Sequence, residues 1–162
     1  MKAIVVVALV AGIASADDWK PVDIDACHCS VAFPGDPHPA KKASMAEHML
    51  EYSVVNGKLV TVYGFSYKKL GDTQEPKIRL DAIADAMIKR HGWPKAYRDV
   101  TYQGLPGIEL VFDIDEHYPR MYEMTYRTLI AKDQMLSLVI TRTSPPDPHA
   151  EQTKFFDSLT LK

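Results

Sequence analysis

Cysteine is scarce in this chain, which has only two among its 162 residues, and neither sign of charge dominates. Lysine and arginine total 19 against 21 aspartate and glutamate residues, so the formal net charge is -2. Proteins that bind nucleic acid usually carry a basic excess or a basic stripe, and neither is visible here. The composition therefore argues against a nucleic-acid partner, and a domain of this length can form an adequate core without disulfides.

Long apolar runs are also missing, with one exception at the start of the chain. Residues 3–13 are uninterruptedly apolar, Lys2 precedes them with a positive charge, and Ala14-Ser15-Ala16 supplies the small-x-small pattern that a signal peptidase needs. The run is far shorter than the ~20 apolar residues of a helix that crosses a bilayer. A buried first strand or helix is the alternative. We expect residues 1–16 to be a signal peptide of a protein that is periplasmic or secreted and does not span the membrane.

The remaining length suits one domain. We expect residues 17–27 to be an irregular N-terminal segment, because Asp-Asp-Trp-Lys-Pro-Val shows no periodicity, and residues 28–162 to be a single domain. Alternating apolar residues between turn signals predict the strands, and an apolar stripe at helical spacing predicts a helix over 77–91. A second, closing helix is predicted over 149–158. The predicted strands are 28–33, 45–55, 58–68, 97–103, 108–114, 120–131 and 134–143.

Turn residues separate these segments. Asn56-Gly57 is a hairpin signal, Pro34 to Lys42 is expected to be a loop, and Gly104 to Gly107 is expected to be a turn. Runs of strands linked by short turns, with segregated helices, indicate an α+β fold. The prediction is a mainly antiparallel sheet of six to seven strands with two helices.

Three motifs carry a resemblance to known proteins: SVAFPGDP at 30–37, GLPGIEL at 104–110 and KFFDSLTL at 154–161. They resemble an uncharacterised group of exported bacterial domains with an FPG-x-P strand end and an FFDS closing helix. The order of elements is similar to the PsbP-like α/β sandwich, named after extrinsic subunits docked on a photosynthetic reaction centre. The resemblance covers most of residues 28–161 and implies a binding or accessory module, not an enzyme. It carries over no functional residue.

Cys27, His28 and Cys29 are the most unusual local feature. Two thiolates and an imidazole could hold copper or zinc, although we expect no cofactor. On a strand the two cysteines share a face, about 7 Å apart at Cα, and His28 points away. Convergence on a metal, or a disulfide, therefore needs a bend in the backbone. A disulfide, an inert buried pair, a metal or redox site and unremarkable thiols all remain open.

Aromatic residues alternate along one predicted strand, where Tyr63, Phe65 and Tyr67 share a face. Such ladders usually pack against neighbouring strands, but an exposed ladder would offer a surface to a partner. We take these three residues as the candidate partner surface.

Patterns for catalysis are weak. Asp113 and Asp115 share the polar face of a predicted strand and could divide acid and base roles, although a solvated strand end explains them more simply. We therefore expect an exported, non-enzymatic binding or accessory module that docks on a protein or cell-envelope partner. The alternatives are a periplasmic metal-handling protein that uses Cys27, His28 and Cys29, and a hydrolase with an unrecognised site. An exposed aromatic patch without a deep polar pocket would favour the first.

Overall fold

Two antiparallel sheets and two helices make up the part of the chain that the computed structural model describes, which is residues 19–39, 48–56, 59–71, 74–117, 120–143 and 149–162. The larger sheet contains β3 (His38–Pro39), β4 (His48–Asn56), β5 (Leu59–Lys69), β6 (Ala96–Tyr102), β7 (Leu105–His117), β8 (Arg120–Ala131) and β9 (Gln134–Thr143). The smaller sheet contains β1 (Lys20–Ile24), β2 (Cys29–Phe33) and β10 (Thr160–Leu161). The helices are α1 (Pro76–His91) and α2 (His149–Asp157), and a 3₁₀ turn, η1 (Asp25–Cys27), joins β1 to β2.

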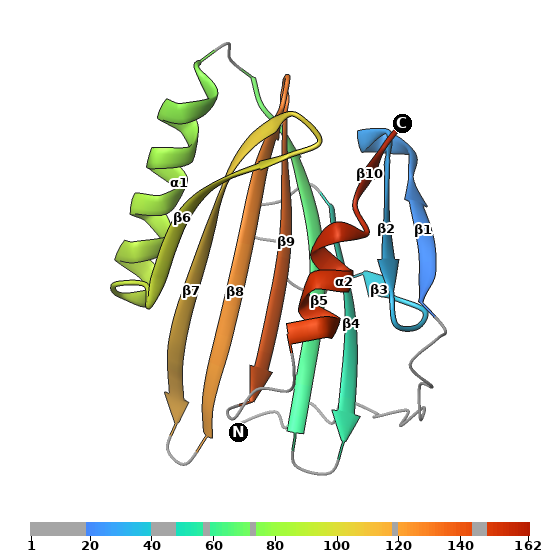
Figure 1. Ribbon diagram of the computed structural model, residues 1–162, viewed down its shortest axis with the longest axis vertical. Helices are drawn as coiled ribbons and strands as arrows, with labels where there is room; N and C mark the ends of the chain where they lie inside the picture. Colours follow the sequence, from blue (N-terminus) through green and yellow to red (C-terminus); the bar gives the residue numbers. More distant parts are fainter. Residues whose placement is uncertain (1–18, 40–47, 57–58, 72–73, 118–119, 144–148) are drawn as a thin grey trace, which may run out of the picture.

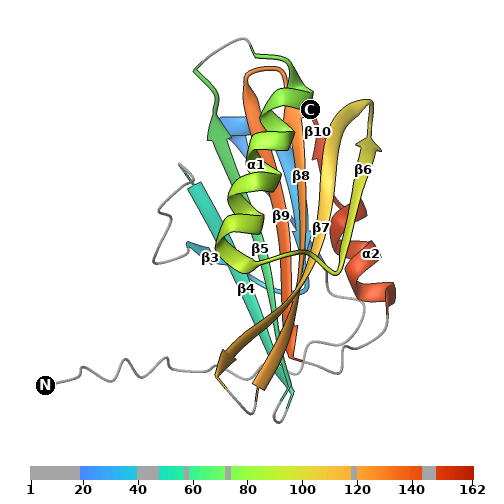
Figure 2. The ribbon, with the colours of Figure 1, turned by 90° about the vertical axis from the view of Figure 1, so that its left-hand side faces the viewer.

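The elements form layers. The strands of the large sheet follow the order β3-β4-β5-β9-β8-β7-β6, and those of the small sheet the order β1-β2-β10. Helix α1 packs on one face of the large sheet, against β7 and β8, while α2 and the small sheet lie on the other face (Figures 1 and 2). The predicted α+β fold, with a mainly antiparallel sheet and two helices, is confirmed. Neither described helix is long and apolar enough to cross a membrane.

Both faces of the large sheet are apolar, and each face has its own core. On the α1 side, Leu80 and Ala84 of the helix pack with Ile108, Leu110 and Phe112 of β7. On the opposite side the core joins β5, β8 and β9 to the small sheet and α2. Its buried members are Cys27, Cys29, Val31, Phe33, Tyr63, Phe65, Tyr67, Leu129, Leu136, Leu138, Ile140, Phe155, Phe156 and Leu159. Side chains alternate across a strand, so one sheet supplies both cores.

Helix α1 begins and ends where the sequence signals predict. Pro76 occupies the first turn, where a missing N–H is tolerated. Gly92 ends the helix at a φ of 83°, which favours glycine, and its N–H donates to Ile88 O at 2.8 Å. The chain therefore leaves the helix through a tight bend and enters β6 within four residues.

Short strands were the part of the fold that the sequence analysis missed. The prediction that residues 17–27 are irregular is wrong for β1, in which Val22 pairs with Val31 and is half-buried. Pro21 argued against a strand at the sequence level, but proline is tolerated at the edge of a sheet, which is where β1 lies. The predicted loop before Lys42 likewise contains β3, which pairs with β4. These strands are too short for a visible alternation.

The β6–β7 turn is tighter than predicted. Gln103 and Gly104 form it, with φ values of 49° and 78°, as expected of the left-handed residues in a two-residue hairpin. The prediction of a turn over Gly104 to Gly107 is therefore wrong at its end. Pro106 and Gly107 already belong to β7 and pair with Thr101 and Val100 of β6.

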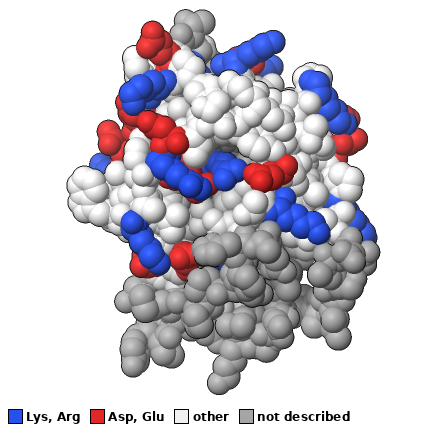
Figure 3. All heavy atoms as spheres, in the orientation of Figure 1, with Lys and Arg blue, Asp and Glu red and all other residues white. Residues whose placement is uncertain are grey.

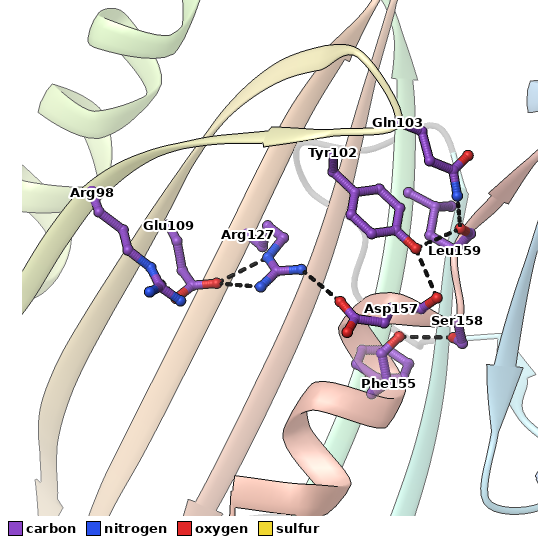
Figure 4. A network of polar contacts seen from close by, with 9 residues as sticks. All are labelled: Arg98, Tyr102, Gln103, Glu109, Arg127, Phe155, Asp157, Ser158 and Leu159. Atoms are coloured by element: carbon purple, nitrogen blue, oxygen red, sulfur yellow. Dashed lines mark hydrogen bonds and ion pairs between the residues drawn. The ribbon is translucent and has the colours of Figure 1, made fainter.

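A row of ion pairs crosses the face that carries α2, where Figure 3 shows basic and acidic side chains side by side. Glu109 of β7, 4% exposed, accepts hydrogen bonds from Arg98 of β6 and from Arg127 of β8, each at 2.9 Å from the donor Nε. Arg127 also approaches Asp157 at 3.6 Å and lies over the Phe156 ring (Figure 4). The row ties the edge of the sheet to α2.

The end of β6 is held to the C-terminal segment by a second set of contacts. The hydroxyl of Tyr102 lies 2.7 Å from Asp157 O and 3.0 Å from Leu159 O, and the Gln103 amide donates to Leu159 O at 2.8 Å (Figure 4). Strand β6 is thus anchored from the α2 side of the sheet.

A second ion-pair cluster surrounds Glu123 of β8. Its carboxylate accepts hydrogen bonds from Arg142 at 2.7 Å and from Lys95 at 3.2 Å. Burial alone would raise the pKa of Glu123, but these two hydrogen bonds and the positive charges that make them outweigh it, so the pKa lies below its ordinary value. The pair with Arg142 holds α2 in place as well, because Arg142 also donates to Gln152.

The close approach of β8 to Gly107 gives a first testable prediction. A Cβ at this position would meet the backbone oxygen of Thr128 and the side chain of Leu129, whereas a Cβ on Gly71 would meet nothing within 4 Å. We expect Gly107→Ala to lower the free energy of unfolding by about 1–3 kcal/mol, the usual cost of overpacking. Gly71→Ala should change it by less than about 0.5 kcal/mol. Urea denaturation followed by circular dichroism measures both, and equal effects would contradict the close approach.

The lowered pKa of Glu123 predicts a pH effect on stability. A carboxyl whose pKa is lower in the folded than in the unfolded protein stabilises the fold above the unfolded pKa of about 4.3. This contribution is lost as the pH falls through the folded pKa. Glu123→Gln should therefore lose stability less steeply than the unaltered protein between about pH 5 and pH 3. Urea denaturation at several pH values tests this, with Glu75→Gln as an exposed control; parallel curves for all three proteins would refute it.

Candidate functional site

The aromatic ladder predicted as a partner surface lies in the core. Tyr63, Phe65 and Tyr67 are 2%, 1% and 5% exposed, so the prediction is wrong. The physical reason is that this face of β5 is covered by the small sheet and α2. Phe155 of α2 packs edge-on against Tyr63 with ring centroids 5.2 Å apart, and Trp19 packs against the same ring at 5.5 Å.

Cys27 and Cys29 form a disulfide, with their Cα atoms 5.4 Å apart. The bend that such a bridge requires is present, because His28 between them is left-handed, with φ 49° and ψ 48°. Both cysteines are buried and His28 is exposed. Sulfur atoms joined in a disulfide are not thiolate ligands. Metal binding by Cys27, His28 and Cys29 therefore stays a prediction that concerns the reduced protein.

The described residues also bear on the predicted catalytic pair. Asp113 lies 3.6 Å from Lys95, and the side chain of Asp115 lies outside the described part of the structure. Across the described residues, no group of three or more His, Cys, Asp and Glu side chains is placed to hold a metal. Glu109, the most buried carboxylate described, accepts hydrogen bonds from the guanidinium groups of Arg98 and Arg127 and is therefore part of the row of ion pairs that holds the sheet.

Two hollows are lined by residues of α1 and of β6 with the chain next to it, and they share Asp81. Both are open to solvent and lie along the same helix, and the two hollows together are here called the α1–β6 groove. The first, of about 220 Å³, is lined by Lys77, Leu80, Asp81, Asp99, Val100, Thr101, Pro106 and Gly107. The second, of about 430 Å³, is lined by Asp81, Ala84, Asp85, Ile88, Trp93, Pro94 and Tyr97.

The periodicities of the two walls explain why these side chains meet. On α1, Lys77, Asp81 and Asp85 are spaced by four residues and therefore share one stripe of the helix. On β6, Tyr97 and Asp99 are two residues apart and share a face of the strand. Arg98, between them, points to the opposite face and pairs with Glu109. One face of β6 is thus anchored while the other faces the groove.

Exposed aromatic side chains line the end of the groove. Trp93, in the connection between α1 and β6, is 86% exposed, and Tyr97 at the start of β6 is 45% exposed. With Ile78 they are the large hydrophobic side chains that are exposed in the described structure. Aromatic residues are enriched at surfaces that bind other molecules, so these side chains define the candidate site.

The groove is electrostatically negative. Asp81, Asp85 and Asp99 contribute three carboxylates, and the one cation among the lining residues, Lys77, lies 3.3 Å from Asp81. Burial raises the pKa of Tyr97, and the negative charges of Asp99 and Asp81 raise it further. The hydrogen bond to Asp81 and the charges of Asp81 and Asp99 raise the pKa of Lys77. Both shifts have the direction that an excess of carboxylates produces.

Alternation of aromatic residues within a strand does not predict this site, because Trp93 lies outside any strand. The available signal was Trp93-Pro94 in a connection between a helix and a strand. A large aromatic residue in such a short connection has few neighbours to cover it. The acidic pair at Asp81 and Asp85 is a second signal, since its helical spacing places both carboxylates on one stripe.

Comparisons with known proteins bear on the fold. No protein-family model and no curated protein matches the sequence. A crystal structure from Bacteroides thetaiotaomicron is similar over 89% of this chain and 48% of its own length, with a TM-score of 0.60 and 12% identity, so this chain spans about half of that protein. A Pseudomonas aeruginosa protein of unknown function is similar over 89% of this chain and 97% of its own, with a TM-score of 0.57 and 13% identity.

The solution structure of cyanobacterial PsbP from Synechocystis is similar over 98% of this chain and 99% of its own length, with a TM-score of 0.58 and 6% identity. At identities this low, the structural similarity shows a shared fold and carries no information about function. The resemblance to the exported bacterial group stays a prediction. The comparisons thus establish that this chain has a PsbP-like α+β fold.

Proposed function

We propose that this chain is an exported, non-enzymatic binding module that docks on a protein or cell-envelope partner through the α1–β6 groove. The observation that carries the proposal is the exposure of Trp93 and Tyr97 along an open groove. A tryptophan or tyrosine side chain buries about 150–250 Å² when it is covered, and these residues are enriched among those that dominate binding energy.

The pKa shifts of Tyr97 and Lys77 bear on what these two groups offer to a partner. A general acid or base works best when its pKa is close to the operating pH. The raised pKa values of Tyr97 and Lys77 move both groups further from neutral pH. Tyr97 therefore keeps its proton and Lys77 its charge, which suits groups that present a constant surface to a partner.

Export rests on the first sixteen residues and agrees with the disulfide. Lys2, the apolar run to Ile13 and Ala14-Ser15-Ala16 have the order of a cleavable signal. Disulfides form and persist in oxidising compartments such as the periplasm. The bridge between Cys27 and Cys29 is consistent with such a compartment.

The proposed export predicts the mature N-terminus. Protein purified from the envelope or medium of the native host should begin at Asp17, because cleavage would follow Ala16. Intact-mass measurement with N-terminal peptide mapping determines this residue. Exported native protein that still begins at Met1 would refute the cleavage, and Ala16→Arg, which blocks the small-residue pattern, should leave the precursor uncut.

The groove predicts that Trp93 is needed for binding. The unaltered protein should co-purify with a partner from the native envelope, and Trp93→Ala should lower the recovery at least about tenfold, as loss of a dominant aromatic contact does. The partner, identified by mass spectrometry, is then purified and titrated with both proteins. Because Trp93 is exposed, Trp93→Ala should change the free energy of unfolding by less than about 0.5 kcal/mol.

Ile78→Ser is the matched control for this experiment. Ile78 is a 56% exposed hydrophobic residue on α1, and it is not among the residues that line the groove. The Ile78→Ser protein should bind the partner with the same affinity as the unaltered protein. Equal affinity of the Trp93→Ala protein and the Ile78→Ser protein for the purified partner would overturn the groove as the docking site.

A further inference from the structure

One wall of the α1–β6 groove is the edge of a sheet. Strand β6 is the last strand of the large sheet and pairs with β7 from Ala96↔Val111 to Tyr102↔Leu105. No other strand in the described part of the chain pairs with β6 (Figure 1). The backbone N–H and C=O groups along such an edge are a template on which another strand can add.

The dimensions of this edge suit an extended peptide. Strand β6 has seven residues, which at about 3.3 Å per residue extend for roughly 23 Å. Its residues Ala96 to Asp99 are exposed, and no strand in the described part of the chain pairs with their outer edge. Helix α1, with 16 residues at about 1.5 Å each, has nearly the same length. An added strand would therefore lie beside the groove over its whole length.

The charge of the lining residues indicates the chemistry of the occupant. The lining residues carry three carboxylates, on Asp81, Asp85 and Asp99, and one ammonium group, on Lys77. The basic residues of the last turn of α1, Lys89 and Arg90, are not among the lining residues of either hollow. The exposed face of Trp93 adds an aromatic surface that attracts cations. An occupant with lysine or arginine side chains complements this surface.

We infer that the α1–β6 groove takes an extended, lysine- or arginine-bearing segment of a protein partner, which adds to β6 as a further strand. This inference rests on the proposed function and specifies the partner. Backbone hydrogen bonds to β6 supply affinity, as in other cases of strand addition, and the carboxylates and aromatic rings select the side chains. Because side chains alternate along a strand, every second residue of the segment faces α1.

A second copy of this chain is a poorer occupant. Pairing of β6 with β6 would bring the Asp99 carboxylate of the other copy beside a groove that already holds three carboxylates. Like charges across an interface suppress association and favour a partner of opposite sign. Charged residues on an edge strand have the same effect, since they oppose pairing between identical edges. The negative groove thus disfavours self-association and accepts a basic strand.

Synthetic peptides test the inference directly on the full mature chain. One seven-residue peptide alternates lysine with valine, and its counterpart alternates glutamate with valine; both have blocked ends. Isothermal titration gives the affinities, and amide NMR shifts locate the site. The lysine peptide should bind at least tenfold more tightly than the glutamate peptide and should shift the β6 amides and the Trp93 indole. Raising the salt from 0.1 to 1 M should weaken binding, because the Debye length falls from about 10 to about 3 Å.

Two modified reagents separate the charge from the strand. The Asp81→Asn/Asp85→Asn protein should bind the lysine peptide about fivefold to tenfold more weakly, as expected when two exposed charge pairs are lost. Asp23→Asn/Asp25→Asn is the control, with the same change in net charge near the small sheet, on the other face of the large sheet. A lysine peptide N-methylated at alternate residues keeps its charges but loses backbone donors. It should bind at least tenfold more weakly if the peptide adds to β6.

Each outcome decides a part of the inference. Equal binding of the lysine and glutamate peptides, absence of binding by both, or equal loss in the two double variants would overturn the basic occupant. Unchanged affinity of the N-methylated peptide would overturn strand addition. A dimer that forms through β6 and excludes the peptide would do the same. An envelope partner that needs Trp93 but does not compete with the lysine peptide refutes this inference alone and leaves the proposed function intact. Peptide binding without a Trp93-dependent envelope partner refutes the proposed function instead.

Discussion

The whole architecture depends on one constraint, which is that the large sheet is apolar on both faces. Ile108, Leu110 and Phe112 face α1, while alternate positions of the neighbouring strands, such as Leu136 and Leu138, face α2 and the small sheet. Apolar surface left in water costs roughly 25 cal/mol per Å², so both faces must be covered. The small sheet is too short to be stable alone, and it persists because the larger sheet completes its core.

Helix α1 does not cover the edge strand of the large sheet, β6, and the α1–β6 groove lies where this cover ends. A helix with its side chains is about 10–12 Å wide, whereas neighbouring strands lie about 4.8 Å apart, so one helix covers two to three strands. Helix α1 packs on β7 and β8. Strand β6 is consequently held from the other face, by Arg98 with Glu109 and by Tyr102 with the C-terminal segment. Its free face then presents Tyr97 and Asp99.

The sequence predicted the long elements well and the covering of their faces poorly. The helix over 77–91 and the strands over 120–131 and 134–143 agree with the structure within one residue at each end, because each carries several repeats of its own period. Periodicity shows which side chains share a face but not what lies on that face. The alternation correctly placed Tyr63, Phe65 and Tyr67 on one face of a strand. The prediction that this face is exposed was wrong, because α2 and β2, from distant parts of the chain, pack on it.

The local bend at His28 was beyond prediction for a related reason. The left-handed conformation of His28 is unfavourable in itself, so the surrounding contacts must stabilise it. These contacts involve segments near both ends of the chain. Cys29 pairs with Leu161 of β10, and His28 O accepts a hydrogen bond from Lys162 N at 2.8 Å. The C-terminal strand thus fixes the backbone beside the disulfide, and no pattern near residue 27 records that contact.

Fold and side chains contribute separately to the inferred binding. An exposed edge strand beside a helix follows from the backbone arrangement, so any chain with this sheet order offers a similar edge. Asp81, Asp85 and Trp93 are features of this sequence, and identities of 6–13% give no reason to expect them in the similar structures. Strand addition is therefore the general part of the inference, because it uses only the backbone of β6. The preference for a cationic segment is the specific part, because it depends on side chains that the fold tolerates but does not require.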